Sequence, residues 1–330
     1  MSEFDKYLIE PNYSEIESRA DVDIMTLLGK HTLASPIIAA NMDTVCSLTM
    51  ASFLAGRGSL GVVHRFMSVE DSLATLKTLK DRHPGRPSAF AVGTLKNDKR
   101  RIDTLAQNGC EILVVDIAHG HSSNCLNTVE YIADGYPEVH IVAGNIVTKE
   151  AVRDLASAGA DTVKVGVGPS NVCTTRLMTG VGVPQPKAIF RCVQEAKAWD
   201  VSVIADGGIR SSSDVAKALA FGADAVMVGS LLAGTDESPG EIVKVDGKNH
   251  KMYRGMASFS ALSDKKKAIG EDEDVAVYRA EEGKVSYVPY VGAAANVMNS
   301  LNAGLRSAFS YVGAEDIKSF HSKANFVTRR

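Results

Sequence analysis

Residues 201–208 read VSVIADGG, and residues 225–230 read AVMVGS. Each run is rich in β-branched and other apolar residues and ends in glycine or a small polar residue. Between them, Val215, Ala218 and Leu219 recur at the spacing of one helix face, and Gly222 follows as a stop signal. Continuous apolar runs are typical of parallel strands that are covered on both faces. The stretch therefore predicts a strand, a helix and a second, parallel strand.

The same unit recurs outward from this stretch along the chain. Eight apolar runs are found at residues 35–41, 59–64, 88–94, 112–118, 139–145, 162–167, 201–208 and 225–230. Helix signals separate them, such as the capping-box sequence that begins at Ser68. We therefore predict an α/β protein, a (β/α)8 TIM barrel that spans residues 1–330 as a single domain. A doubly wound open sheet is the alternative, but no Gly-x-Gly-x-x-Gly sequence follows the first run.

The composition excludes several classes of protein. The 330 residues carry a net charge of −3 and no basic block, so we expect no nucleic acid partner. The longest apolar runs have about eight residues, too few to cross a membrane. The first nine residues are polar and charged, unlike a signal peptide, and the five cysteines lie far apart without a C-x-x-C pair. We expect a cytoplasmic protein without a disulfide framework.

Two segments after the eighth run interrupt the strand–helix repeat. Residues 241–255 read as a β-hairpin with Asp246-Gly247 at its turn. Residues 257–287 are polar, charged and without clear periodicity, which fits either a disordered insertion or a mobile lid. Barrel enzymes keep their active sites at the carboxyl ends of the strands, and this segment follows the last strand there. We therefore favour a mobile lid.

Residues 164–176, KVGVGPSNVCTTR, place a cysteine in an unusual loop. Gly166 and Gly168 permit tight or left-handed backbone, and Cys173 has polar and cationic neighbours that favour a reactive thiolate. A buried, inert cysteine is the commoner alternative, and it suits Cys192, which lies in a helical pattern. It suits Cys173 poorly because this loop lacks apolar periodicity. Cys173 is therefore a candidate nucleophile.

Polar residues also stand at the carboxyl ends of other predicted strands. The seventh and eighth runs end in Asp206-Gly-Gly208 and Gly229-Ser230, and loops at these places in barrels often hold a phosphate through backbone N–H groups. Asp206 suits ribose hydroxyls, whereas the alternative is that the glycines only make short turns. His119 and His121 lack clear carboxylate or thiolate partners, so they are better interpreted as polar lining or surface than as a metal pair.

Together these motifs resemble one enzyme family. The Cys173 loop, residues 179–185 (TGVGVPQ), 40–45 (ANMDTV), 205–208 (ADGG) and 253–256 (YRGM) are similar, in the same order, to the IMP dehydrogenase and GMP reductase family. The resemblance implies that the Cys173 thiolate adds to C2 of a purine nucleotide and that a nicotinamide cofactor, NADPH, acts at the same carbon. It also implies a homotetramer and a monovalent cation, K+, bound by the backbone carbonyls of Gly166, Gly168 and Cys173.

The resemblance further implies two sets of ligand-binding residues. Contacts to the nucleotide substrate are implied for Asp206, Gly207, Gly208, Gly229, Ser230, Tyr253, Gly255, Met256, Arg279 and Gly283. Contacts to NADPH are implied for Arg65, Asp116, Ile117, Ala118, Tyr278 and Ser307. Both sets rest on the motifs of the family alone.

The lid discriminates between the two activities of the family. Residues 278–284, YRAEEGK, resemble the reductase lid, in which Glu282 and Thr175 would protonate the departing ammonia, and the Arg-Tyr pair of dehydrogenase lids is missing. No regulatory CBS module follows the second run, and Ile117 after Asp116 is typical of reductases. We therefore predict an oxidoreductase of purine metabolism, an NADPH-dependent GMP reductase that forms IMP and ammonia.

Other residues leave alternatives open. Residues 234–241 and 253–256 read more like a dehydrogenase, so an IMP dehydrogenase without the regulatory module is the first alternative. Ser170-Asn171 and Glu281 depart from both patterns, which bears on the cation loop and on recognition of the base. A nucleotide-binding barrel without catalysis is the second alternative, and the intact catalytic motif counts against it.

Overall fold

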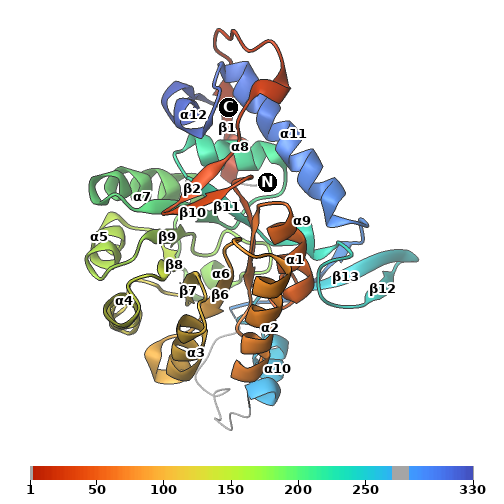
Figure 1. The fold of residues 1–330 in the computed structure, drawn as a ribbon. Coiled ribbons are helices and arrows are strands. Elements are labelled where there is room, and N and C mark those ends of the chain that lie inside the picture. Colours follow the sequence, from red (N-terminus) through yellow and green to blue (C-terminus); the bar gives the residue numbers. More distant parts are fainter. Residues whose placement is uncertain (1–2, 270–281, 330) are drawn as a thin grey trace.

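The computed structural model describes residues 3–269 and 282–329 and contains a closed barrel of eight parallel strands, as predicted (Figure 1). The strands are β4 (Ile37–Ala39), β5 (Leu60–Val63), β6 (Ala89–Val92), β7 (Ile112–Asp116), β8 (His140–Ile146), β9 (Thr162–Val165), β10 (Ser202–Asp206) and β11 (Ala225–Val228). β11 pairs with β4 and closes the ring. Each strand overlaps one of the eight apolar runs. Strands that are covered on both faces carry apolar residues at nearly every position, so they stand out as continuous apolar runs in the sequence.

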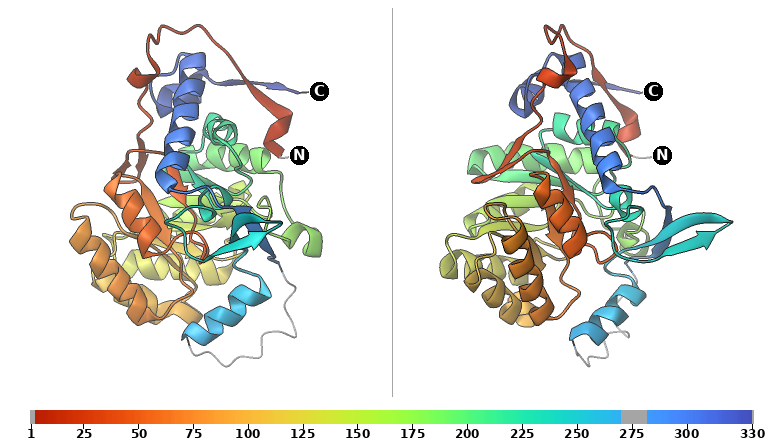
Figure 2. Two further views of the ribbon diagram at one scale, coloured as in Figure 1. Left: turned by 90° about the vertical axis from the view of Figure 1, so that its right-hand side faces the viewer. Right: turned by 45° about the vertical axis from the view of Figure 1, so that its right-hand side comes forward.

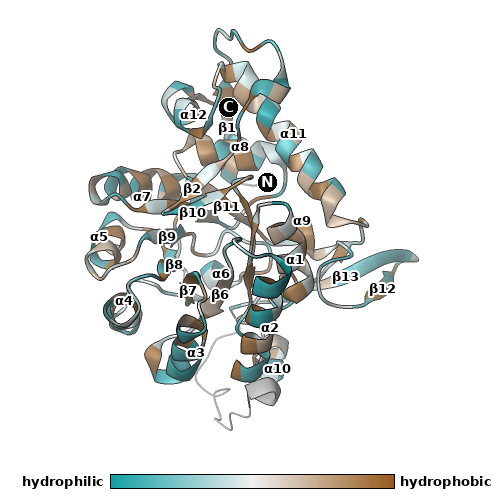
Figure 3. Ribbon diagram, viewed as in Figure 1, coloured by the Kyte–Doolittle hydropathy of each residue, from teal (hydrophilic) through white to brown (hydrophobic). Residues whose placement is uncertain are grey.

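The helices between the strands form an outer ring. They are α1 (Leu48–Gly56), α2 (Val69–Arg82), α3 (Leu95–Gln107), α4 (Ser123–Gly135), α5 (Lys149–Ser157), α7 (Gln185–Trp199) and α8 (Ser212–Ala220), with the short α6 (Thr175–Thr179) and α9 (Ser230–Ala233) after β9 and β11. Ser68, Thr148 and Ser211 cap α2, α5 and α8 by accepting backbone N–H hydrogen bonds. Figure 3 shows hydrophilic and hydrophobic residues on the same ring helices, as expected where one side packs on the barrel. Within the described residues, no helix is both long and apolar enough to cross a membrane.

The amino end of the barrel is closed by a short hairpin. It consists of β2 (Thr26–Leu28) and β3 (His31–Leu33), and Leu28 and Leu33 join the buried side chains that fill the barrel interior. The Thr26 hydroxyl donates to the Asp224 carbonyl just before β11, and the His31 ring lies 5.7 Å from the ring of His140 at the start of β8. A ligand site therefore has to lie at the opposite, carboxyl end of the strands.

The two ends of the chain pack together outside the ring. The 3-10 helix η1 (Glu3–Lys6) leads into β1 (Tyr7–Glu10), which pairs with β15 (Asn325–Thr328) in an antiparallel ladder. A second 3-10 helix, η2 (Arg19–Asp21), and the helices α11 (Ala294–Val312) and α12 (Ile317–Lys323) complete this part of the molecule, and α11 packs along α8. Figure 2 shows both termini on the same side of the molecule.

A three-stranded sheet and one further helix follow the last barrel strand. β12 (Ile242–Val245), β13 (Lys248–Arg254) and β14 (Val285–Pro289) form an antiparallel sheet that projects from the barrel (Figures 1 and 2), with Asp246 and Gly247 at positive φ in the first turn. The segment that we expected to be aperiodic contains α10 (Phe259–Ile269). Its sequence hides the helix because a polar run, residues 263–267, interrupts the apolar pattern after the first turn.

Candidate active site

A cavity of about 930 Å³ lies at the carboxyl ends of the barrel strands. Every strand contributes to its lining: Asn41 follows β4, Arg65 follows β5, Gly93 follows β6, Asp116 ends β7, Asn145 lies in β8, Gly166 follows β9, Asp206 ends β10 and Gly229 follows β11. Cavities of about this size hold small molecules and cofactors in many proteins. The arrangement brings eight separate segments of the chain to one site.

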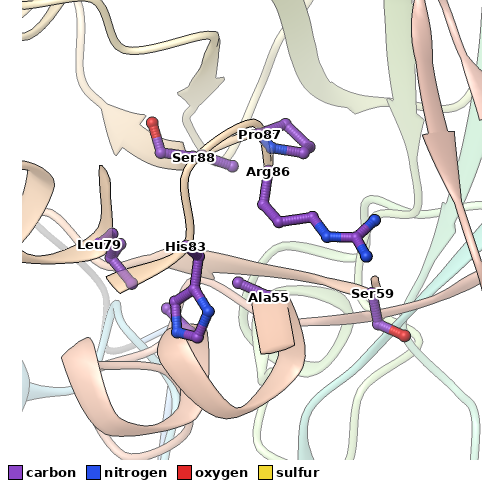
Figure 4. A pocket seen from close by; sticks show the side chains of 10 residues that line it. Ala55, Ser59, Leu79, His83, Arg86, Pro87 and Ser88 are labelled. Carbon is purple, nitrogen blue, oxygen red and sulfur yellow. The ribbon is translucent and has the colours of Figure 1, made fainter. Parts of the chain in front are cut away.

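A second hollow lies between α1, the end of α2 and the starts of β5 and β6. Ser59, Leu79, His83 and Arg86 are among its lining residues (Figure 4), and its volume is about 10 Å³. Space of this size holds roughly one water molecule. The large cavity is therefore the candidate active site.

The three predicted catalytic residues meet inside the large cavity. The Cys173 sulfur lies 3.2 Å from the Thr175 hydroxyl oxygen, and this hydroxyl donates to a Glu282 carboxylate oxygen at 2.7 Å. Cys173 is partly exposed, whereas the other four cysteines are buried. The structure thus provides a continuous chain of hydrogen bonds from a reachable sulfur to a carboxylate.

Backbone contacts set the register between Glu282 and the Cys173 loop. The Thr174 N–H donates to the Glu282 carbonyl at 3.0 Å, and the Lys284 N–H donates to the Val172 carbonyl at 2.9 Å. Gly283, between these bonds, packs so closely that an added Cβ would lie 2.8 Å from the Ser258 nitrogen. The two segments form a short antiparallel bridge, which holds the carboxylate beside Thr175.

Gly255 and Met256 directly follow β13, and Gly255 lies against this bridge. A Cβ on Gly255 would lie 2.8 Å from the Val172 carbonyl oxygen, so only glycine allows the approach. The Met256 sulfur accepts the Asp43 N–H at 3.4 Å. Both residues line the cavity, and so do Tyr253 and Glu282.

A buried lysine connects the ends of three barrel strands, and the sequence did not reveal its role. Lys164 of β9 is 2% exposed, and its ammonium lies 2.8 Å from the Asp116 carboxylate and 2.6 Å from the Asp206 carboxylate. Asn145 of β8 joins the cluster by donating to Asp206 at 2.9 Å and by accepting from Lys164. Lys164 was hard to detect because its partners are distant in sequence and only the barrel brings them together.

The charges in this cluster stabilise one another. Burial alone would lower the pKa of Lys164, but attraction to Asp116 and Asp206 outweighs it and raises the pKa above its ordinary value. Burial likewise works against a charged Asp116, yet Lys164 holds the pKa of this carboxyl below its usual range. The predicted ribose contact, Asp206, and the predicted cofactor contact, Asp116, therefore share one cation, Lys164.

The loops after β10 and β11 approach the Cys173 loop closely. Gly207 has a φ of +97°, and an added Cβ would lie 2.7 Å from Pro169. A Cβ on Gly229 would lie 2.6 Å from the Tyr253 hydroxyl oxygen, which hydrogen-bonds with the Ser170 side chain and the Ser230 backbone. Burial raises the pKa of Tyr253 to about 12, so this hydroxyl stays neutral. Gly208 and Ser230 line the same part of the cavity.

The cofactor residues predicted from the β5 and β7 ends lie on the other side of the cavity. Arg65, Ile117 and Ala118 line it together with Asp116. The Arg65 guanidinium lies 5.4 Å from the centre of the Phe66 ring, which is also a lining residue. All four residues predicted to bind the cofactor from these two strand ends therefore face one cavity.

The helix α10 also borders the cavity, which the sequence did not show. Phe259 and Leu262 of α10 are lining residues. Arg254 anchors the helix because its guanidinium pairs with Asp43 after β4 and, at 2.8 Å, with Asp264 of α10. Asp43 lies far from Arg254 and Asp264 in the sequence, and no sequence pattern indicates that the three residues are in contact.

Two of the predicted site residues that the structure describes, Gly283 and Ser307, are not lining residues of the cavity. Ser307 lies on α11, where its hydroxyl donates to the Ala303 carbonyl, and it is not a lining residue. Its contact with a cofactor stays a prediction. Tyr278 and Arg279 lie outside the described residues.

The three residues of the predicted cation site lie in one loop after β9 and line the cavity. The Gly166 carbonyl accepts a hydrogen bond from the Asn145 amide at 2.7 Å, so it is already engaged in the lysine cluster. Gly168 and Cys173 lie farther along the same loop and line the cavity. In the described ranges, no group of three or more His, Cys, Asp or Glu side chains is placed to hold a metal ion. A carbonyl oxygen has two lone pairs, so this bond leaves one free on Gly166, and the cation site stays a prediction.

Comparisons with known proteins identify the family. The model of the IMP dehydrogenase / GMP reductase domain matches residues 2–330. A GMP reductase from Ascaris suum is 38% identical over 334 residues, which cover 98% of this chain and 92% of the relative. An inosine-5'-monophosphate dehydrogenase from Aquifex aeolicus is 48% identical over 237 residues, which cover 72% of this chain and 48% of the relative. The chain spans about half the length of several dehydrogenases that it matches.

A solved structure agrees with the sequence comparisons. The crystal structure of a GMP reductase from Trypanosoma brucei in complex with guanosine 5'-monophosphate has a TM-score of 0.92 and 30% sequence identity, and the match covers 99% of this chain and 95% of that chain. The family model and this structure both extend over nearly all of the barrel and its loops. The chain belongs to the IMP dehydrogenase / GMP reductase family of oxidoreductases of purine nucleotides.

Proposed function

We propose that the protein is a GMP reductase, which converts GMP to IMP and ammonia with NADPH as the hydride donor. The hydrogen-bond chain from Cys173 through Thr175 to Glu282 is the observation that carries the proposal. A thiol needs a base to become a nucleophile, and an amine needs an acid to leave. Glu282 stands where one carboxyl group can serve first as the base and then as the acid.

In the first half of the reaction, Cys173 replaces the amino group at C2 of GMP. The thiol proton passes to Thr175 while the Thr175 hydroxyl gives its own proton to Glu282, and the sulfur forms a bond to C2. Glu282 then returns the proton to the amino group, the C–N bond breaks and ammonia leaves. A thioimidate then joins Cys173 to C2. The proton relay, which consists of Thr175 and Glu282, is back in its starting protonation state.

In the second half, C2 is reduced and the enzyme is released. When bound, NADPH supplies the hydride that C2 accepts. The C–S bond then breaks, IMP leaves, and Cys173 departs as a thiolate, which regains its proton from solvent water, with Thr175 passing the proton to the sulfur. A neutral Tyr253 and the glycine turns at Gly207 and Gly229 are suited to hold the nucleotide during both halves, because they offer uncharged donors and room for a phosphate.

The lysine cluster supports placing two ligands side by side. Asp206 lies on the side of the glycine turns and Asp116 on the side of Arg65, and Lys164 holds both carboxylates. We assign the ribose of GMP to Asp206 and the cofactor to Arg65, Asp116, Ile117 and Ala118. The Arg65 cation suits the additional phosphate of NADPH, which NADH lacks.

IMP dehydrogenase is the second candidate function. An inosine-5'-monophosphate dehydrogenase from Helicobacter pylori is 41% identical over 98% of this chain, so identity to dehydrogenases is as high as identity to reductases. That reaction would require the protein to activate water after hydride has left C2. Among the described residues, Glu282 and Thr175 are also the groups that lie closest to such a water beside Cys173.

The test is to supply the purified protein with GMP and NADPH and, separately, with IMP and NAD. We expect NADPH to be consumed in the first mixture and no NADH to form in the second. NADH formation from IMP alone would refute the reductase proposal and establish the second candidate.

Variants at the relay refine the test. Glu282→Gln should abolish release of ammonia while binding of GMP, measured by calorimetry, largely persists. Cys173→Ala should abolish turnover and covalent labelling. Glu130→Gln, on the exposed side of α4, is the matched control and should behave as the wild type. Unchanged turnover in Glu282→Gln would remove this residue from the mechanism.

A further inference from the structure

The N-terminal turn η1 packs on the loop that follows β10. Phe4 is fully buried, and its ring lies 3.9 Å from the position that a Cβ on Gly208 would take. Asp5 pairs with Arg210, two residues farther along the same loop, at 2.6 Å. Lys217 of α8 donates to the Phe4 carbonyl at 3.2 Å. A segment at one end of the chain thus supports a turn that lines the active-site cavity.

Glu3 extends this support to the Cys173 loop. One of its carboxylate oxygens pairs with the Arg176 guanidinium, and the other accepts the Gln185 backbone N–H at 2.6 Å. Arg176 lies three residues after Cys173, and Gln185 begins α7. Both oxygens of one side chain are therefore used to hold two parts of the segment that contains the nucleophile.

Arg176 ties together the two ends of the same loop. Its Nε donates to the Val167 carbonyl at 3.0 Å, and its Nη2 donates to the Val183 carbonyl at 2.5 Å. The side chain runs between Gly168 and Gly182, where an added Cβ would lie 2.4 Å and 2.6 Å from its Cγ. Val167 precedes Cys173 and Val183 follows it, so the guanidinium closes the loop and Glu3 orients the guanidinium.

Gln185 carries the contact on to the barrel. Its side chain is fully buried, and its Nε2 donates to the Val165 carbonyl at 2.8 Å and to the Asp206 carbonyl at 3.0 Å. These carbonyls belong to the ends of β9 and β10, the strands before the Cys173 loop and the glycine turn. Because Glu3 accepts the Gln185 backbone N–H, it helps to hold Gln185 in contact with the ends of β9 and β10.

We propose that Glu3 is a positioning residue, which holds the Cys173 loop through Arg176 and Gln185 in the geometry where the sulfur meets Thr175. Glu3 does not line the cavity, so it acts through these two neighbours and not on a ligand. The expected kinetic effect rests on the proposed function, because a loosened nucleophile slows covalent attack more than it weakens binding. The effect on the loop itself does not depend on which reaction the protein catalyses.

The loop is tested without turnover by measuring how fast iodoacetamide alkylates Cys173, followed by mass spectrometry of the labelled peptide. The other four cysteines are buried, so Cys173 reacts first. Glu3→Ala should raise the alkylation rate about fivefold, because the untied loop exposes the sulfur more often. Glu3→Gln keeps the length and one acceptor oxygen, and its rate should lie between those of Glu3→Ala and the wild type.

Glu195→Ala is the matched control. Glu195 lies on α7 and pairs with Arg153 at 3.1 Å, away from the Cys173 loop, so its loss should leave the alkylation rate unchanged. A wild-type rate in Glu3→Ala, or an equal increase in the control, would overturn the proposal. An equal increase in Glu195→Ala would mean that the loss of any ion pair raises the alkylation rate of Cys173.

Kinetics supply the second readout. In the GMP and NADPH assay, Glu3→Ala should lower kcat about tenfold while KM for GMP changes less than about threefold. A change confined to KM would contradict a positioning role. If the wild type does not consume NADPH with GMP, the proposed function fails, and the alkylation rates still decide whether Glu3 holds the loop.

Discussion

Thr175 and Glu282 are 107 residues apart in the sequence, and the Thr175 hydroxyl donates to the Glu282 carboxylate at 2.7 Å. The contact arises because the segment around Gly283 pairs with the Cys173 loop through backbone hydrogen bonds on both sides of Glu282. The register of this bridge places the carboxylate beside the hydroxyl. A shift of one residue would turn the side chain to the other face and break the relay.

The relay predicts that Thr175→Val slows catalysis without unfolding the protein. Valine has the same shape but no hydroxyl, so the path from the Cys173 sulfur to the Glu282 carboxylate is interrupted. We expect kcat to fall about 10²-fold, the scale of a lost acid–base step. Thr175→Ser keeps the hydroxyl and should retain most of the activity. A valine variant as active as the serine variant would exclude a proton path through residue 175.

The lysine cluster predicts that Lys164→Met is costly to both stability and binding. Asp116 and Asp206 would face each other without their shared cation, and removing one partner of a buried ion pair costs about 3–5 kcal/mol. We expect that loss in the free energy of unfolding by urea and no measurable binding of GMP by calorimetry.

Lys251→Met is the control for this prediction. Lys251 is also buried, at 4% exposure, but its ammonium donates to the backbone carbonyls of Thr235 and Ser238 and not to a carboxylate pair of the cavity. The control should lose stability and still bind GMP. Equal loss of GMP binding in both variants would show that the lysine cluster has no special part in the site.

The close approach of two loops predicts a steric effect of Gly229→Ala. The new Cβ would lie 2.6 Å from the Tyr253 hydroxyl oxygen and 3.2 Å from the Met42 sulfur, so the part of the cavity that we propose for the phosphate must shift. We expect affinity for GMP to fall at least about tenfold, which corresponds to about 1.4 kcal/mol. Gly135→Ala, where an added Cβ meets nothing within 4 Å, is the control and should bind normally.

A buried histidine predicts how stability depends on pH. Burial lowers the pKa of His64 to about 4 from an ordinary value of 6.5, and its Nδ1 accepts the Phe66 N–H at 3.1 Å. Between these two values the unfolded chain binds more protons at His64 than the folded protein does. The free energy of unfolding should therefore fall as pH drops from 6.5 towards 4, by at most roughly 3 kcal/mol from this group.

His64→Asn isolates this contribution. Asparagine keeps an acceptor for the Phe66 N–H but does not titrate, so stability of the variant should fall less steeply over the same pH range. Burial also lowers the pKa of His140 to about 4, but His140 is present in both proteins and its contribution cancels in the difference. Parallel pH profiles for variant and wild type would contradict the assignment to His64.

The helix α10 and the Lys164 cluster mark the limits of prediction from sequence. α10 was expected to be aperiodic because its apolar residues lack a sustained period, and Arg254 holds it through Asp43 and Asp264 by contacts that no pattern reveals. Lys164 is the first residue of the Cys173 loop motif, residues 164–176. The sequence gives it no role, because its carboxylate partners lie at the ends of two other strands. Ser307 is assigned to a cofactor from family motifs alone; the fold places it on α11, outside the cavity lining, and its role stays a prediction.

The amino-acid sequence by itself determined the eight strands, the order of the loops and the identity of the candidate nucleophile. It did so because apolar runs, helix caps and the glycines around Cys173 are local properties, readable within a few residues. Only the tertiary structure decided that Thr175 faces Glu282, that Lys164 joins Asp116 to Asp206, and that Glu3 reaches Arg176. The residues in each of these contacts are 42 to 173 positions apart in the sequence. The geometry of each contact therefore depends on barrel closure and strand register, which are properties of the whole chain.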